Sequence, residues 1–125
     1  METTILVVDG YETVRTALRK WLEIEFPTAN VLEAVNGADA IKCIARQAPS
    51  MVIIDVLLPG SNGISATRKI REKLPLVPIV ILSMYEDEEY RVDLTKAGAN
   101  AFIPKRQMHT RLIPRISTML DAVKV

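Results

Sequence analysis

Four side chains that suit phosphoryl chemistry follow short apolar runs of the sequence. They are Asp9 after residues 5–8, Asp55 after residues 51–54, Ser83 after residues 79–82, and Lys105 shortly after residues 101–103. Packing alone gives no reason for a charged side chain to follow such a run. We therefore interpret the four residues as parts of one chemical site.

Each of these residue types has a role in transferring a phosphoryl group to a carboxylate. A carboxylate nucleophile and an incoming phosphoryl group are both anionic, so a hard cation must neutralise their repulsion. Mg²⁺ with oxygen ligands suits that role. A lysine can stabilise charge on the transferred oxygens, and a hydroxyl can hydrogen-bond one of them. The set is chemically self-consistent.

Taken singly, three of these residues have an ordinary structural explanation. Asp9 could cap the helix that follows it, Lys105 could be a solvated loop lysine, and Ser83 could be a turn residue or a cap. Capping explains Asp55 poorly, because an apolar loop sequence follows it at residues 56–60. The joint occurrence of all four at the ends of different strands favours the functional interpretation.

The apolar runs predict five buried parallel strands. The runs are short, mostly β-branched and apolar on both alternating faces, which is typical of strands covered on both sides. They lie at residues 5–8, 29–34, 51–54, 79–82 and 101–103. Amphipathic segments with helical spacing separate them, which implies βαβ units with right-handed crossovers. We expect a doubly wound, flavodoxin-like α/β fold with strand order 2-1-3-4-5, in which ligands bind beyond the carboxyl ends of the strands.

The last amphipathic segment contains a proline that opposes a continuous helix. Leu112, Ile116 and Leu120 keep helical spacing, but Pro114 has no backbone donor. Because proline is tolerated in the first turn of a helix, we expect regular helix to begin near Leu112. Residues 106–111 would then form an irregular approach to it.

Composition and charge limit the possible classes of function. The 125 residues suit one domain, spanning 1–125, with its own core. Sixteen basic and fifteen acidic residues give a net charge of +1, so no bulk field draws the chain to nucleic acid or to a membrane. The single cysteine, Cys43, excludes an intramolecular disulfide and a cysteine zinc site. It suits a reducing cytoplasm, which is where we expect the protein.

Motifs of conventional enzymes are missing from the sequence. There is no glycine-rich loop ending in Gly-Lys-Ser/Thr. A dehalogenase-like hydrolase would need a second aspartate two residues after Asp55, where this chain has Leu57. No apolar run reaches the roughly 18–20 residues that span a bilayer. We expect neither an enzyme nor a membrane protein.

Several motifs, in the right order, resemble the receiver domain of two-component response regulators. They are residues 5–9, residues 52–55 with Pro59-Gly60 and Asn62-Gly63, residues 81–83, residues 97–99, and Phe102 three residues before Lys105. The resemblance covers about residues 4–123. Residues 64–68 and 83–90 are further similar to the subfamily whose receivers precede a LuxR-type (NarL-like) helix-turn-helix domain.

The resemblance implies a role for each site residue. Asp55 would accept a phosphoryl group from a sensor histidine kinase, and Lys105 would pair with that group. Mg²⁺ would be held by Asp9, Asp55 and the backbone carbonyl of Leu57. Ser83 would move toward the phosphate and the ring of Phe102 inward behind it, reshaping the face of the fourth helix, fifth strand and fifth helix.

The resemblance also implies partners. They would be the kinase, a C-terminal LuxR-type DNA-binding domain outside this chain, and a second copy of the chain in a homodimer. The receiver itself would contact neither nucleic acid nor membrane. The sequence suits a stand-alone receiver and the receiver of a longer regulator equally well.

The chain departs from the family pattern at the metal site. The family usually has a second acid after the first strand, which is a direct Mg²⁺ ligand, and here that residue is Gly10. We expect weaker Mg²⁺ binding, with Glu12 as a candidate substitute ligand. Gly10 also motivates an alternative function, a receiver-shaped interaction module that needs no phosphate. In addition, Leu57 and Tyr85 are not small polar residues that would orient an attacking water, so we expect a long-lived phosphoryl group.

Overall fold

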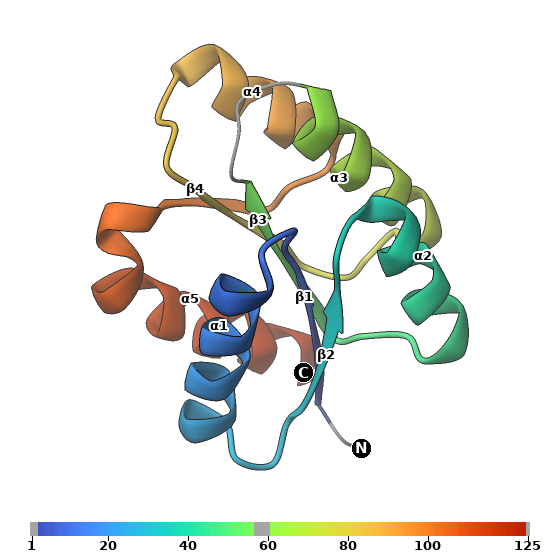
Figure 1. Ribbon diagram of the computed structural model, residues 1–125, viewed down its shortest axis with the longest axis vertical. Helices are drawn as coiled ribbons and strands as arrows, with labels where there is room; N and C mark the ends of the chain where they lie inside the picture. The colour runs from blue at the N-terminus through green and yellow to red at the C-terminus, as the bar shows by residue number, and fades with distance from the viewer. Residues whose placement is uncertain (1–2, 57–60, 125) are drawn as a thin grey trace.

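Five parallel strands form one sheet at the centre of the molecule. The computed structural model describes residues 3–56 and 61–124 (Figure 1). The strands are β1 (Thr4–Val8), β2 (Asn30–Ala34), β3 (Met51–Val56), β4 (Ile79–Ser83) and β5 (Ala101–Pro104). Their order in the sheet is β2-β1-β3-β4-β5. This order confirms the predicted flavodoxin-like fold class.

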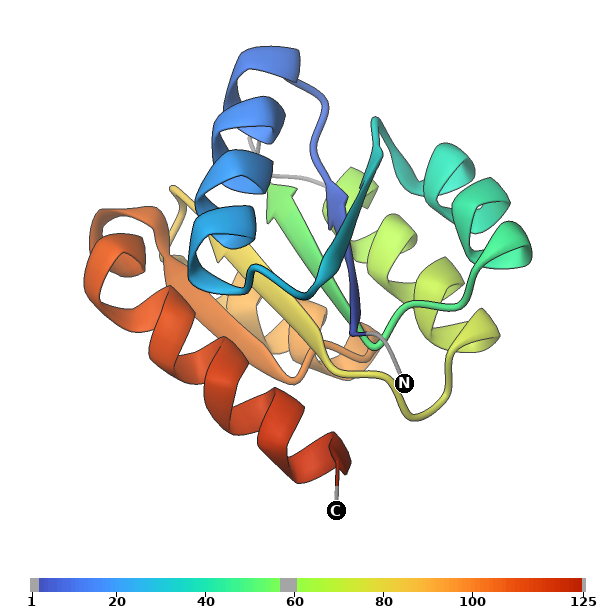
Figure 2. The same ribbon diagram turned by 90° about the horizontal axis from the view of Figure 1, so that it is seen from below.

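Helices cover both faces of the sheet, as Figure 2 shows. One face carries α1 (Glu12–Glu25) and α5 (Met108–Lys124). The opposite face carries α2 (Gly37–Arg46), α3 (Ser61–Lys73) and α4 (Glu88–Ala97). A sheet covered on both faces explains why the central strands β1, β3 and β4 are largely apolar, whereas the edge strand β2 includes Asn30 and Glu33.

The core consists of two apolar layers, one on each face of the sheet. Alternate residues of the same strand belong to different layers: Ile5 and Val7 pack with Leu18 and Leu22 of α1, whereas Leu6 packs in the other layer. Every residue of β1, β3 and β4 is buried. These three central strands therefore hold the residues at their carboxyl ends in fixed positions.

Strand register brings the predicted site residues to one edge of the sheet. Val8 pairs with Ile54 across β1 and β3, so Asp9 and Asp55 follow neighbouring positions. Asp55 is opposite Leu82 across β3 and β4, one residue before Ser83. The chain reverses strand order beside β1, and the carboxyl ends of β1 and β3 flank that switch point.

The predicted start of the last helix was wrong. A short 3-10 helix, η1 (Lys105–Gln107), is followed at once by α5, which begins at Met108 and contains Pro114. Leu112, Ile116 and Leu120 are buried in the core. Their burial orients the whole helix, and it outweighs the loss of one backbone hydrogen bond at Pro114.

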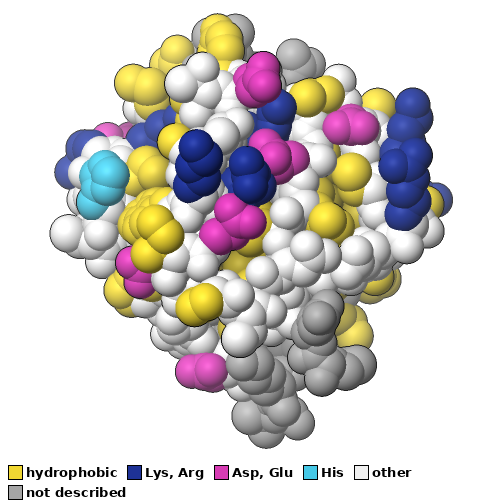
Figure 3. Space-filling model, turned by 60° about the horizontal axis from the view of Figure 1, so that its bottom comes forward, with side chains coloured by type: hydrophobic (Ala, Val, Ile, Leu, Met, Phe, Trp, Pro, Cys, Tyr) yellow, Lys and Arg dark blue, Asp and Glu magenta, His cyan; other side chains and the backbone are white. Residues whose placement is uncertain are grey.

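The surface carries acidic and basic side chains that are largely interspersed, as the face in Figure 3 shows. This distribution agrees with the nearly balanced composition of sixteen basic and fifteen acidic residues. Among the described residues, no helix combines the length and the apolar character that crossing a bilayer requires.

Candidate functional site

Asp55 is a buried carboxylate that forms an ion pair with Lys105. It is the second-last residue of β3, and its side chain is only 1% exposed. Lys105 is the first residue of η1, directly after β5, and its Nζ lies 2.7 Å from Asp55 Oδ2. Asp55 of β3 and Lys105, which follows β5, thus meet at the carboxyl edge of the sheet, although β4 separates the two strands.

Asp9 is the second buried carboxylate of this edge and directly follows β1. Its Oδ1 accepts a hydrogen bond from the backbone N–H of Tyr11 at 2.9 Å, and its backbone oxygen accepts one from Arg15 Nη1 at 3.0 Å. Tyr11 is itself the N-cap residue of α1, and its side chain makes no capping bond. The Asp9 carboxylate therefore fixes the β1–α1 loop and does not cap the first turn of the helix.

The two carboxylates share a site of low solvent exposure with one ammonium. The pKa of Asp55 is raised from 3.8 to about 6: burial raises it most, the bond with Lys105 partly lowers it, and the neighbouring charge of Asp9 raises it further. Asp55 Oδ1 and Asp9 Oδ2 are buried without a hydrogen-bond partner among the described residues. Two acids and one base give the site a net charge of −1 when all three are ionised.

Ser83 lies at the same edge, but its hydroxyl bonds to its own loop. It is the last residue of β4 and fully buried. The hydroxyl donates to the Tyr85 carbonyl at 3.1 Å and accepts from the Tyr85 amide at 2.9 Å. In this conformation it holds the start of the β4–α4 loop.

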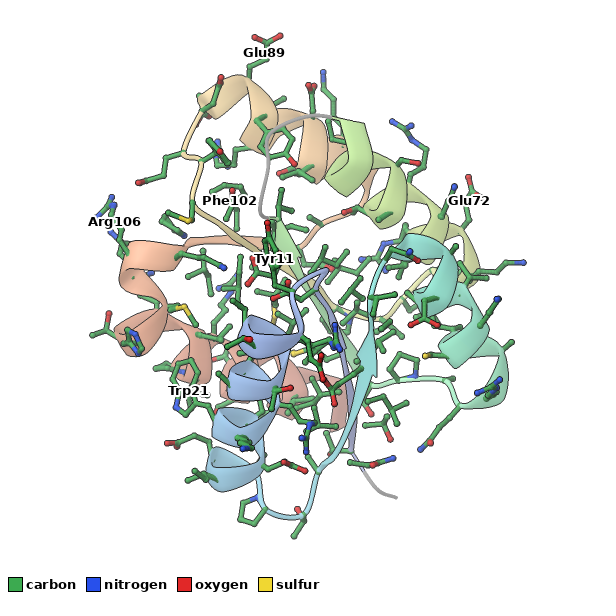
Figure 4. All side chains as sticks on the ribbon, in the orientation of Figure 1. Tyr11, Trp21, Glu72, Glu89, Phe102 and Arg106 are labelled. Carbon is green, nitrogen blue, oxygen red and sulfur yellow. The ribbon has the colours of Figure 1, made fainter. Side chains whose placement is uncertain are left out.

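Phe102 is on β5, opposite Ile81 of β4, and is partly buried. Figure 4 shows it between α4 and the start of α5. Its ring packs against the core layer that contains Ile81, Tyr90 and Leu94. Phe102 lies two residues before Pro104, which is opposite Ser83 in the pairing of β4 with β5.

The remaining predicted metal ligands are not assembled by the described residues. Leu57, whose carbonyl was a predicted ligand, lies outside the described residues. Gly10 is exposed, and a Cβ atom there would meet only Val35 O, at 3.7 Å. Glu12 begins α1 with an exposed side chain. Within residues 3–56 and 61–124, no group of three acidic, histidine or cysteine side chains could hold a metal.

Arg15 is a site residue that the sequence did not reveal. Besides the Asp9 carbonyl, its guanidinium binds Glu33 of β2, with Nε 2.9 Å from Oε1. Glu33 also pairs with Arg19 at 2.8 Å. An arginine within an amphipathic helix gives no sequence signal for such a role, because its partner comes from a different strand.

Comparison with known proteins identifies the family. The profile of the response regulator receiver domain matches residues 5–117, which is most of the chain. This chain belongs to the response regulator receiver domain family. Receiver domains of this family are signal transducers, and they generally bind Mg²⁺ at their phosphorylation site.

The relatives of this receiver domain include regulators of two lengths. The oxygen regulatory protein NreC of Staphylococcus epidermidis is 33% identical over 116 residues, which cover 92% of this chain and 53% of that protein. The chemotaxis protein CheY of Halobacterium salinarum is 34% identical over 122 residues, covering 98% of this chain and all of that protein. The chain thus spans about half the length of NreC.

Solved structures support the same fold. A LuxR-family two-component response regulator from Aurantimonas sp. superposes with a TM-score of 0.85 at 29% identity, over 98% of this chain and 87% of that one. A CheY-like receiver domain protein from Methanospirillum hungatei has a TM-score of 0.87 at 23% identity, over 99% and 98% of the two chains. Together with NreC, the Aurantimonas structure supports the predicted resemblance to NarL-like receivers.

Proposed function

We propose that Asp55 accepts a phosphoryl group from a sensor histidine kinase and that the receiver domain thereby changes its partner-binding face. One observation carries the proposal: Asp55 is buried at the carboxyl edge of the sheet, with Lys105 Nζ at 2.7 Å and Asp9 adjacent. No packing need explains two acids and a lysine in this position.

The chemical step is a displacement at phosphorus. An Asp55 oxygen forms a bond to the phosphorus atom while the bond from phosphorus to the histidine nitrogen of the donor breaks. The nitrogen keeps the electron pair of the broken bond. Lys105 would then move from the Asp55 carboxylate to the transferred oxygens, which carry more negative charge.

The buried acids fit a hard divalent cation. Asp9 Oδ2 and Asp55 Oδ1 lack hydrogen-bond partners among the described residues, and carboxylate oxygens are the ligands that Mg²⁺ prefers. Asp9, Asp55 and the Leu57 carbonyl would hold the ion. When bound, it would supply the positive charge that offsets repulsion between Asp55 and the donor phosphate. Gly10 removes one carboxylate from this set, so we expect the ion to bind weakly.

Ser83 and Phe102 would carry the change to the surface. A phosphoryl group presents three acceptor oxygens, and these would compete with the Tyr85 carbonyl for the Ser83 hydroxyl. Release of Tyr85 would free the start of the β4–α4 loop. Phe102 would then move inward beside β4, altering the face formed by α4, β5 and α5.

The wider setting of the receiver follows from its relatives. We propose that residues 1–125 form a receiver domain that controls a C-terminal LuxR-type DNA-binding domain, because the NreC relatives are about twice as long. The receiver would work in the cytoplasm, partner a histidine kinase and form homodimers. It would catalyse no reaction on a separate substrate and bind neither nucleic acid nor membrane directly.

A phosphodonor assay tests the proposal. The purified chain is incubated with Mg²⁺ and acetyl phosphate and then weighed by intact-mass spectrometry. We expect a gain of about 80 Da, the mass of one phosphoryl group. The gain should vanish in Asp55→Asn and persist in Asp121→Asn, a matched control on the exposed surface of α5.

A second candidate function remains because of Gly10, which removes a usual metal ligand. In that case the chain would be a receiver-shaped interaction module that needs no phosphate. No mass gain at saturating acetyl phosphate and Mg²⁺ would reject phosphorylation and support this alternative.

A further inference from the structure

An arginine-lined groove runs along the outer edge of the sheet between α4 and α5. Its volume is about 500 Å³, within the roughly 300–1,000 Å³ of pockets that hold ligand-sized groups. Its floor is β5, including Ala101, Phe102 and Ile103, and Pro114 of α5 forms part of one wall. The side chains at the base of the groove are therefore apolar, and the groove is open to solvent above.

Arginines line both walls of the groove, and those of the α5 wall form no ion pair with an acid of the described residues. Arg91 comes from α4, and Arg111 and Arg115 come from α5. Among the described residues, no aspartate or glutamate lines the groove. Arg91 forms an ion pair with the exposed Glu88. Arg111 donates a hydrogen bond to Gln107 Oε1 at 2.6 Å. Arg115 makes no hydrogen bond or ion pair with any part of the chain that the structure describes.

The floor of the groove offers backbone hydrogen-bonding groups. β5 is an edge strand that pairs only with β4. Asn100 directs its backbone N–H to Ile79 beside β4. Backbone groups of successive strand residues point to opposite sides, so those of Ala101 and Ile103 face the groove. Pro114 also lacks an amide hydrogen, which leaves the Thr110 carbonyl without its helical donor.

We propose that this groove binds an extended, acidic polypeptide segment that pairs with the free edge of β5. Strand addition to an exposed sheet edge is an established mode of peptide binding. Side chains of an added strand would alternate between the α4 wall and the α5 wall, and each wall carries arginine. Acidic residues that face α5 would pair with Arg111 and Arg115, and those that face α4 would compete with Glu88 for Arg91.

The geometry favours a peptide over other anions. The arginines are exposed, and no charged side chain of the lining is buried enough to form a pocket for a small anion. A membrane surface would not reach the backbone of β5 at the base of a concave groove. The inference rests on the proposed function in one respect, because it names the chemistry of the partner for the face that phosphorylation would alter.

A binding experiment with the whole chain tests the proposal. The probe is a fluorescein-labelled peptide of repeated Val-Glu-Asp triplets, followed by fluorescence anisotropy. We expect saturable binding that weakens with salt, and no binding of the same peptide with lysine in place of each acid. Arg111→Gln with Arg115→Gln should weaken binding about ten-fold, because two ion pairs are lost.

Matched variants separate the groove from net charge. Arg46→Gln with Arg68→Gln removes the same charge from exposed positions on α2 and α3, and it should leave the affinity unchanged. Methylation of alternate peptide amides should abolish binding, and peptide addition should shift the amide resonances of Ala101 and Ile103. Asp55→Asn should still bind the peptide, so that a failure of phosphorylation and a failure of the groove can be told apart.

Three outcomes would overturn the proposal. One is the absence of binding up to millimolar acidic peptide. Another is equal weakening by the groove pair and the control pair of arginine substitutions. The third is binding to phosphatidylglycerol vesicles without binding to the peptide, which would assign the arginines to a membrane surface instead.

Discussion

At the scale of single residues, the site holds two acids against one base in a buried position. Lys105 neutralises the charge of Asp55. The charge of the Asp9 carboxylate has no cationic partner among the described side chains. Burial makes that remaining charge costly, and the cost appears as the raised pKa of Asp55. A bound cation or a transferred phosphoryl group with its cation would change this balance, so the site is sensitive to both.

The raised pKa makes the stability of the fold depend on pH. The pKa of Asp55 rises from 3.8 to about 6 on folding, so its stabilising contribution is complete below pH 3.8 and is lost as the pH rises through about 6. The rise corresponds to about 3 kcal/mol. Asp55→Asn, which is neutral throughout, should therefore be more stable than the wild type by up to about 3 kcal/mol at pH 8.

Urea unfolding at several pH values measures this difference. The gap between Asp55→Asn and the wild type should narrow as the pH falls from 8 toward 4. Asp121→Asn, on the exposed surface, should show no such trend. A gap of constant size across this range would show that Asp55 does not ionise with a raised pKa.

Gly10 gives a second prediction at this scale. A Cβ atom there would meet only Val35 O at 3.7 Å, an ordinary contact, and Gly10 is exposed, so Gly10→Asp should fold normally. The added carboxylate should tighten Mg²⁺ binding about ten-fold or more, since a unit charge about 4 Å from a divalent ion is worth about 2 kcal/mol even in water. Isothermal titration calorimetry measures the affinity. Glu12→Ala in the same assay should have no effect if its exposed side chain stays outside the site.

The charged residues of the site were predictable from the sequence, but their hydrogen bonds were not. Asp9, Asp55 and Lys105 were predictable because the carboxyl ends of parallel strands meet at one edge. The partner of the Ser83 hydroxyl was not, because a serine bonds to whichever backbone group its loop presents. The role of Arg15 depends on a helix and a strand that only the fold brings together.

At the scale of elements, Arg71 joins three segments at the amino-terminal edge of the sheet. It lies in the last turn of α3. Its guanidinium donates to the carbonyls of Leu74, Val77 and Gly98 at 2.7–3.1 Å and to Asn100 Oδ1 at 2.7 Å. These contacts hold the turn before β4 against the turn before β5. Their common donor is one partly buried cation.

Arg71→Met should therefore destabilise the fold by about 2–4 kcal/mol, because several acceptors lose a charged donor at once. Arg68→Met, one helical turn away and exposed, should change stability by no more than about 0.5 kcal/mol. Chemical unfolding of both variants makes the comparison. Similar small losses in both would mean that solvent replaces the Arg71 contacts.

Pro114 provides an opposite prediction for α5. It is exposed and lies within the helix, where it removes the hydrogen bond to the Thr110 carbonyl. An interior proline costs about 3 kcal/mol, partly offset by about 1 kcal/mol of lost freedom in the unfolded chain. Pro114→Ala should stabilise the fold by about 1–2 kcal/mol in thermal or urea unfolding. A loss of stability would show that the proline ring makes packing contacts worth more than the bond.

The elements themselves were largely predictable from the sequence. Short, largely apolar runs identified all five strands to within one or two residues, because strands covered on both faces have few polar positions, although the edge strand β2 includes Asn30 and Glu33. The start of α5 was missed by four residues. Pro114 favours a helix that begins late, so that the proline lies in its first turn. The burial of Leu112, Ile116 and Leu120 stabilises a longer helix around the proline, and this tertiary packing outweighs the local cost.

At the scale of the whole molecule, the sheet connects the site to the groove. β5 forms the floor of the groove and ends next to Lys105, which pairs with Asp55. β4 lies beside β5 and ends at Ser83. A phosphoryl group on Asp55 would therefore act on the ends of two strands at once, and these strands reach the surface where a partner would bind.

How long such a signal lasts depends on the access of water to Asp55. The residue is only 7% exposed, and neither Leu57 nor Tyr85 has a small polar side chain that would orient an attacking water. Spontaneous hydrolysis should be slow, so the phosphorylated protein should persist for many minutes once acetyl phosphate is removed. Tyr85 is partly exposed in the loop after β4, and Tyr85→Asn should shorten the lifetime several-fold by holding a water near the site. An intact-mass time course measures both decays, with Met84→Asn as the neighbouring control. Loss of the wild-type phosphoryl group within seconds would mean that another group in the site activates water.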